Sequence, residues 1–347
     1  NDSREVYLEM QSSLLMWGNL LCASGGALKP SKCYWYNVGY ECDQFGVWDY
    51  AEMVNAELLV HLPDGSLTPI KQLHVHEPRE MLGTFSCPSG DDSTHLKRKI
   101  LDRIEKWSNR TKNSHLPIRL AWMSYRFKLW PGIRYGLATL ATPLDVASTL
   151  LANSNYRMLS FLGVNRNVKR GWRSIPRAFG GMGLLSFPVE QLICWINMLT
   201  QHFGVPSVLG SKFGASLEAL QLELGTNGNP LSLDYSTYGC LATPCWFKVV
   251  WERLWFYRFD MHLDYPTIPF PREHDELLVD LFLAYGATDN RLQSLNRCRL
   301  ALNMLFLSDI VSANGRQLQR HLLNPLTSEP PISIYSFPRE CPSASDW

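Results

Sequence analysis

Apolar residues near the start of the chain recur with the period of an amphipathic helix. Five of them follow one another at spacings of three or four residues: Val6, Met10, Leu14, Trp17 and Leu21. This spacing places them on one face of a helix. The pair Gly25-Gly26 ends the pattern, because glycine is common just beyond helix C-termini. We therefore predict a helix over 4–24.

The next segment changes to the pattern of short strands. Aromatic and β-branched residues are concentrated in 33–40 and 46–54, which predicts a hairpin. Similar runs at 57–61 and 67–73 predict a second hairpin, with Pro, Asp and Gly at 63–65 as its turn. The N-terminal region is thus expected to form a small β structure beside one helix.

From residue 94 the pattern becomes helical again, with two stripes on adjacent faces. The apolar stripe consists of Leu96, Ile100, Ile104 and Trp107. The basic stripe consists of Lys99, Arg103, Lys106 and Arg110. Both repeat at intervals of three or four residues, which predicts a helix over 95–110 with one buried and one cationic face.

More helices are predicted downstream. The expected ranges are 118–130, opened by Pro117 and ended by Pro131-Gly132, then 143–162, 188–203, 246–259, 274–285 and 292–311. A loop rich in Arg, Lys and Gly covers 163–183, and a polar stretch with Gly and Asn covers 205–240. We read the polar stretch as a linker, and the Pro- and Ser-rich residues from 324 as an extended tail.

These patterns predict an α+β protein with a small β region followed by mainly helical parts. The expected segments are 1–93, the β region; 94–204, a basic helical part; 205–240, a linker; 241–323, a helical C-terminal unit; and 324–347, the tail. Of the residues, 46% are hydrophobic and 19% charged, which favours a folded chain over a disordered one. Nine scattered cysteines and the lack of a secretory signal favour a nuclear or cytoplasmic protein with reduced thiols.

The net charge of +1 conceals a strongly basic block. Residues 97–177 contain 17 Lys and Arg against three acids, a local charge of +14, whereas 1–96 carry −8 and 178–347 carry −5. Scattered Lys and Arg usually belong to solvated helix faces. Here almost no acids accompany the bases, so we favour a surface that binds a polyanion such as nucleic acid.

Three short motifs give the first indication of a family. They are 25–36 with the sequence GGALKPSKCYWY, 80–83 with EMLG, and 175–185 with IPRAFGGMGLL. In this order, with a basic helix between the second and the third, they resemble the palm end, thumb and connector of reverse transcriptases of non-LTR retroelements. The glycines of 180–183 fit neither the phosphate-binding loop of NTPases nor the dinucleotide fingerprint, so we predict a structural turn there.

The resemblance implies specific roles for individual residues. Lys32 would be a catalytic residue near the incoming triphosphate, and Met81, Leu82 and Gly83 would seat the primer end. The helix over 95–110 would be the thumb. Expected contacts to nucleic acid are Lys99, Arg103, Lys106, Arg110, Arg119, Arg126, Arg166, Lys169, Arg170, Trp172 and Arg173. Trp172 has two interpretations, stacking on an unpaired base or anchoring a core, and we favour the core because tryptophan is mostly buried.

The resemblance also implies what a whole enzyme would need. The catalytic aromatic-x-Asp-Asp turn is absent, and Gly90-Asp91-Asp92 lies between polar residues instead of between apolar strands. We expect this chain to be a fragment that binds a template–primer duplex, RNA–DNA or DNA, beside the fingers and palm encoded upstream in the same polyprotein. It would synthesise nothing alone. Mg²⁺ is implied for the full-length enzyme, and no metal site is expected in this chain.

One competing class stays open. The chain can also be a non-catalytic scaffold, derived from a retroelement, that binds nucleic acid or a protein partner. The spacing of Cys240 and Cys245 from the nearest histidines is too loose for a zinc finger. No apolar run is long enough for a membrane span, so no membrane partner is expected.

Overall fold

The computed structural model describes residues 3–42, 48–52, 56–62, 64–81, 83–90, 93–319, 333–338 and 342–346. The chain divides into two compact units, 1–95 and 96–347. Within the described residues both helices and small sheets occur, so the predicted α+β class is confirmed.

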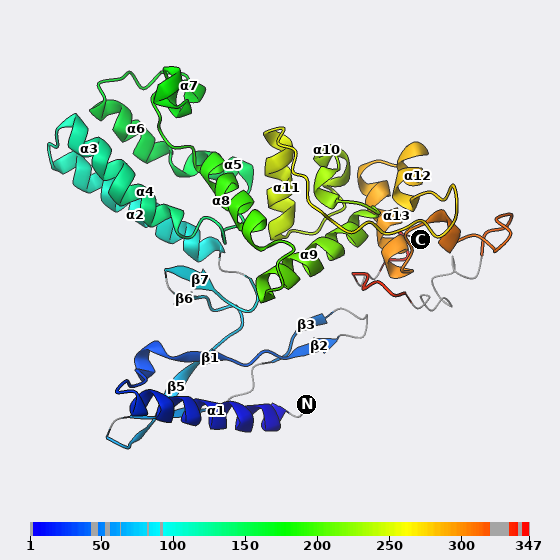
Figure 1. The fold of residues 1–347 in the computed structure, drawn as a ribbon, viewed down its shortest axis with the longest axis horizontal. Helices are drawn as coiled ribbons and strands as arrows, with labels where there is room; N and C mark the ends of the chain where they lie inside the picture. Colours follow the sequence, from blue (N-terminus) through cyan, green and yellow to red (C-terminus); the bar gives the residue numbers. More distant parts are fainter. Residues whose placement is uncertain are drawn as a thin grey trace. The chain divides into compact units, whose positions relative to one another are not determined.

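The first unit is built from one helix and a small mixed sheet. The predicted N-terminal helix is present as α1 (Ser3–Ala23). The three-stranded sheet has the order β1 (Tyr34–Tyr36), β5 (Leu67–Leu73), β4 (Leu58–His61). The helix lies along this sheet (Figure 1). Its Tyr7, Met10 and Leu14 pack against the buried residues of the sheet. Trp17, predicted to face the core, is 57% exposed, so the buried face is rotated from the predicted one.

Strand pairing in this unit follows the prediction only in part. The second predicted hairpin is confirmed, since β4 and β5 are antiparallel with Leu58 opposite Ile70. Strands β2 (Tyr40–Cys42) and β3 (Trp48–Tyr50) also pair antiparallel. However, β1 does not belong to that hairpin and pairs in parallel with β5. This pairing buries Trp35 against the sheet core, which explains why it prevails over the local hairpin.

Two further short elements complete the first unit. A single 3₁₀ turn, η1 (Pro30–Lys32), precedes β1. A tight hairpin is formed by β6 (Arg79–Met81) and β7 (Thr84–Ser86), with Met81 opposite Thr84. Met81 and Gly83, which the resemblance assigns to the primer end, thus belong to a hairpin, and Leu82 lies outside the described residues.

The second unit is helical. Its α-helices are α2 (Ser93–Asn113), which begins in the first unit, α3 (Ile118–Ser124), α4 (Trp130–Arg134), α5 (Leu144–Leu150), α6 (Ala152–Phe161), α7 (Arg170–Ser174), α8 (Phe187–His202), α9 (Val208–Leu224), α10 (Tyr235–Tyr238), α11 (Trp246–Phe256), α12 (Leu278–Ala284) and α13 (Asp289–Ala301). Short 3₁₀ turns are η3 (Arg177–Phe179), η4 (Pro230–Ser232) and η5 (Leu307–Asp309).

The predicted break at Pro131-Gly132 is wrong. The chain stays helical to the end of α4, with Pro131 near the start of that helix. A π-turn, η2 (Tyr125–Leu129), precedes it, and the N–H of Trp130 donates to the carbonyl of Tyr125, five residues back. The wider turn accommodates Pro131, which lacks an N–H group. The helix therefore continues past the proline with a locally altered hydrogen-bond pattern.

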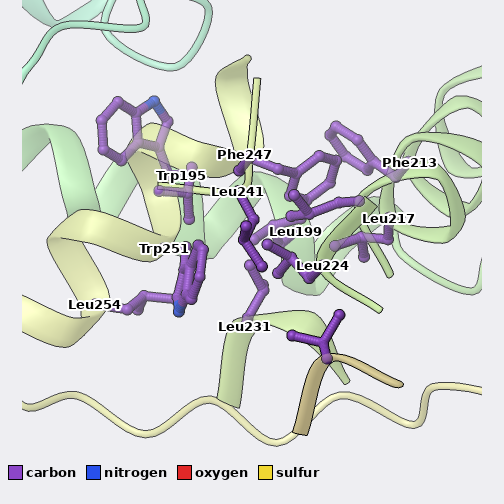
Figure 2. Packing of buried hydrophobic residues seen from close by; sticks show 14 of the residues in the cluster. Trp195, Leu199, Phe213, Leu217, Leu224, Leu231, Leu241, Phe247, Trp251 and Leu254 are labelled. Atoms are coloured by element: carbon purple, nitrogen blue, oxygen red, sulfur yellow. The ribbon is translucent and has the colours of Figure 1, made fainter. Parts of the chain in front are cut away.

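The predicted linker over 205–240 is also wrong. Helix α9 lies within it, and its Phe213, Leu217 and Leu224 belong to a large hydrophobic core cluster of the second unit. Figure 2 shows these side chains packed with Trp195 of α8 and Trp251 of α11. Exposed Lys212 and Glu218 interrupt the apolar pattern of α9 in the sequence, and polar Gln221 and Glu223 are buried beside its apolar residues, which hid the apolar stripe.

The C-terminal region differs from the prediction in two places. The helix predicted over 292–311 ends at Ala301, where Asn303 takes a positive φ of 54°. In the tail, the described residues include a turn at 343–346, which is not extended. Asp346 of this turn pairs with Arg297 of α13. The remaining tail residues, 324–332, 339–341 and 347, lie outside the described ones.

Candidate nucleic-acid interface

A groove of about 540 Å³ lies between α2 and the segment from α3 to α4. Figure 1 shows these helices side by side. Five bases and one acid are among its lining residues: Lys99, Arg103, Lys106, Arg110 and Lys128, with Asp102. All four members of the predicted basic stripe of α2 therefore line one concave surface.

The apolar stripe of α2 sets this orientation. Leu96, Ile100 and Ile104 are buried, as predicted, and Trp107 closes the stripe. The indole Nε1 of Trp107 donates to Oγ of Ser124 at 2.9 Å, and its ring lies 5.8 Å from that of Tyr125. With this face fixed, the basic residues three positions along the helix must face the groove.

Tyr125 anchors the opposite wall of the same core. Burial raises the pKa of its hydroxyl above the usual range. The protonated hydroxyl donates to Oδ1 of Asn155 at 3.0 Å and accepts from the N–H of Leu185 at 3.2 Å. It thereby joins η2 (Tyr125–Leu129), α6 and the segment just before α8 behind the groove.

The bases of the groove differ in how they are held. Lys106 forms an ion pair of 2.7 Å with Asp102. Arg103 donates to the carbonyl of Gly132, and a Cβ at Gly132 would lie 2.5 Å from the Arg103 guanidinium. Arg110 and Lys128 have neither an ion pair nor a hydrogen bond from their side chains within the described part of the chain. These two are available to a ligand, whereas Arg103 also supports the groove wall.

Two other predicted contact residues lie outside this groove. Arg119 is exposed on α3. Arg126 lies 5.2 Å from the ring centre of Trp122 and donates to the carbonyl of Gly183 at 3.3 Å. Arg177 stacks on the same Trp122 ring at 4.1 Å. Arg126 thus ties η2 to the glycine turn.

The basic loop after α6 is organised by one of its own arginines. Arg173 donates to the carbonyls of Arg166 and Val168, at 2.7 and 2.8 Å through Nη2. Arg166, Lys169 and Arg170 are exposed on the same loop. Arg173 therefore stabilises the loop, and Arg166, Lys169 and Arg170 carry the positive charge that is exposed to solvent.

Trp172 and the glycine turn complete this loop. The favoured interpretation of Trp172 as a core anchor is wrong, because the side chain is 47% exposed. The structural turn is confirmed: Gly180 and Gly183 have φ values of 79° and 67°. A Cβ on Gly181 would lie 2.1 Å from the carbonyl oxygen of Ile175, so only glycine fits.

A second groove, of about 1540 Å³, lies within the first unit. Lys32 lines it together with Met81 and Gly83 of the β6–β7 hairpin. Gly83 has a φ of 94°, as a tight turn at this place requires. The structure thus brings together two motifs that lie some 50 residues apart in sequence.

Sequence reasoning missed three bases that line pockets in the second unit. Lys128 lies in the helix predicted over 118–130, Lys112 follows the basic stripe, and Arg157 is the only charged residue of α6. The π-turn over 125–129 changes the direction of the side chains within it, so helical periodicity in the sequence does not place Lys128 opposite the α2 stripe. Lys112 and Arg157 had no sequence signal of their own.

Candidate metal ligands do not gather anywhere in the described ranges: no group of three or more His, Cys, Asp or Glu is present there. Among the helices of these ranges none has the length and apolar character needed to cross a membrane.

Comparison of the chain with protein-family models, curated proteins and solved structures finds no significant match. The function is therefore argued from the geometry and chemistry of the two grooves.

Proposed function

We propose that the chain is the C-terminal part of a reverse transcriptase-like, RNA-directed DNA polymerase, and that the α2 groove grips the template–primer duplex. The observation that carries the proposal is the lining of that groove, five bases to one acid. Duplex phosphates attract such a surface because each neutralised phosphate releases a counterion. The contacts would position the duplex without reading its sequence.

The groove in the first unit supports the same assignment. In the enzymes that the chain resembles, the motif lysine lies near the triphosphate and the Leu-Gly hairpin seats the primer end. Here Lys32, Met81 and Gly83 line one groove, which is the arrangement that those roles require. In the proposal, Lys32 neutralises charge on the departing pyrophosphate, and the backbone at Gly83 contacts the primer terminus.

The proposed fragment is expected to bind and not to polymerise by itself. Its only adjacent pair of aspartates is Asp91-Asp92, without apolar strands on either side in the sequence. The catalytic aspartates and the Mg²⁺ ions they hold would belong to upstream parts of the enzyme. The described helices would serve as thumb and connector.

Fluorescence anisotropy with a labelled RNA–DNA hybrid tests the proposal. The variant Lys106→Glu/Arg110→Glu/Lys128→Glu reverses three groove charges and spares Arg103, which supports the wall. The matched control, Lys212→Glu/Arg291→Glu/Arg316→Glu, makes the same change in charge at exposed bases away from the groove. We expect the groove variant to weaken binding at least tenfold more than the control, because it removes local contacts and not only net charge.

The same experiment separates the competing class. Equal weakening by both variants would mean that the groove has no special part in binding, and would overturn the assignment. Absence of hybrid binding by the unmodified chain at low salt would favour the protein-binding scaffold. Circular dichroism of each variant confirms that a loss of affinity is not a loss of fold.

A further inference from the structure

A long part of the second unit contains no acidic residue. Between Asp145 and Glu190 the sequence has six bases and neither Asp nor Glu: Arg157, Arg166, Lys169, Arg170, Arg173 and Arg177. Bases on ordinary protein surfaces are interspersed with acids. This stretch therefore keeps a positive potential, and it is separate in sequence from the α2 stripe.

A pocket of about 660 Å³ opens within this stretch and its neighbour α2. Its lining residues are Lys112, Asn153, Tyr156, Arg157, Ser160, Phe161 and Arg166. Three are basic, two aromatic and none acidic. The guanidinium of Arg157 is fixed by the carbonyl of Ser108 at 3.0 Å and by Oδ1 of Asn109 at 3.2 Å. A fixed guanidinium without a carboxylate partner is a suitable site for a phosphate.

Two aromatic rings are exposed on the segment that follows Arg166 of this pocket in the sequence. Trp172 is 47% exposed and Phe179 80% exposed. The loop that carries them is well supported, since the N–H of Leu184 donates to the carbonyl of Arg173 at 2.8 Å and that of Gly183 to Ile175 at 2.9 Å. Exposed rings on a supported loop offer flat faces on which unpaired bases can stack.

Arg173, which follows Trp172 in the sequence, contacts two residues of the pocket. Its guanidinium lies 5.2 Å from the ring centre of Tyr156, which lines the pocket. Its Nη2 also donates to the carbonyl of Arg166, another lining residue. Trp172 precedes Arg173 on the same short helix, α7, so it belongs to an element that contacts the cationic pocket.

We propose that this surface binds an unpaired strand of nucleic acid, with phosphates in the Lys112–Arg157–Arg166 pocket and bases stacked on Trp172 and Phe179. Stacking requires a free base face, which a duplex does not offer, so the ligand is single-stranded. The inference rests on the proposed function for the class of ligand and adds a second site to it. In that setting the strand is the template beyond the paired region.

The test is fluorescence anisotropy with a labelled dT12 oligonucleotide and with a blunt RNA–DNA hybrid. The variant is Trp172→Ala/Phe179→Ala. The control is Phe256→Ala/Tyr285→Ala, which removes two rings that are 52% and 86% exposed elsewhere in the same unit. We expect the variant to weaken dT12 binding about tenfold or more, to leave hybrid binding within twofold, and the control to change neither.

Three further results show whether base stacking, the cationic pocket or the duplex groove provides the affinity. An abasic oligonucleotide of the same length that binds as tightly as dT12 would overturn the stacking part, since only phosphates would then matter. Lys112→Glu/Arg166→Glu should weaken both oligonucleotides, and unchanged binding would overturn the pocket. If dT12 binds and the hybrid does not, the proposed duplex grip fails while this site stands; if only the hybrid binds, the reverse holds.

Discussion

Arg253 of α11 donates a hydrogen bond of 2.9 Å to the carbonyl of Thr142, a residue 111 positions earlier in the chain. Its other terminal nitrogen donates to the carbonyl of Pro188 at 3.0 Å, and its guanidinium lies 5.3 Å from the ring centre of Trp195. The side chain is fully buried, and burial lowers the pKa of its guanidinium. One arginine thus ties α11 to the start of α8 and to the loop before α5.

This relationship predicts a large loss of stability for Arg253→Met. Methionine keeps the contact with Trp195 but leaves the carbonyls of Thr142 and Pro188 without their donor in a buried place. The expected cost is about 3 kcal/mol in the free energy of unfolding. Urea denaturation followed by circular dichroism measures it. Arg291→Ala, an exposed arginine of α13, serves as control and should change stability by less than about 0.5 kcal/mol.

A second prediction concerns the dependence of stability on pH. Asp234 caps α10: its carboxylate accepts from the hydroxyls of Ser236 and Thr237, from the N–H of Thr237 at 3.1 Å and from Nε1 of Trp255 at 2.8 Å. These bonds, that from Ser236 first, lower the pKa of Asp234 to about 2. An aspartate in the unfolded chain has a pKa of about 3.9.

Because the folded pKa is the lower one, the stabilisation by Asp234 is complete above about pH 4 and is lost as the pH falls towards 2. Asp234→Ala should therefore cost about 1 kcal/mol at pH 7 and progressively less between pH 4 and 3. Chemical denaturation of both proteins across this range measures the difference. A cost that stays constant down to pH 3 would rule out the carboxylate as its origin.

The helices with strong local signals were predictable, and the reason is visible in α2. Its Leu96, Ile100, Ile104 and Trp107 repeat without interruption, so a single face is apolar and no distant contact is needed to choose it. The basic face of the candidate site followed from the same periodicity. Helix α9 was missed, although its Phe213, Leu217 and Leu224 are buried, because glycine and polar residues interrupt the pattern.

Other features depend on tertiary contacts that no local pattern contains. The parallel pairing of β1 with β5 joins strands more than 30 residues apart. The helix over Pro131 depends on the π-turn before it, and the position of Lys128 in the groove depends on that turn in consequence. The pocket around Arg157 is formed by α2, α6 and the following loop. The grouping of its three bases therefore depends on tertiary contacts and could not be predicted from the sequence.

A third prediction follows from the close approach of the glycine turn to α7. Gly181→Ala would place a methyl group within 2.1 Å of the backbone of Ile175, so the loop that carries Trp172 must open. We expect a loss of about 2 kcal/mol and faster tryptic cleavage between residues 166 and 177. In Gly171→Ala, on the same loop, the methyl group meets no atom within 4 Å. Equal cleavage rates in the two variants would show that the turn does not hold the loop.

The fourth prediction uses salt to count the contacts of the α2 groove, and it depends on the proposed function. If Arg110 neutralises one duplex phosphate, its replacement removes one released counterion. Arg110→Gln should then make the slope of log K against log salt concentration shallower by about 1. Titrations of an RNA–DNA hybrid at four salt concentrations measure the slope. Arg316→Gln, at an exposed position outside the groove, should leave it unchanged. A slope altered equally by both replacements would mean that Arg110 acts through the general field of the protein and touches no phosphate.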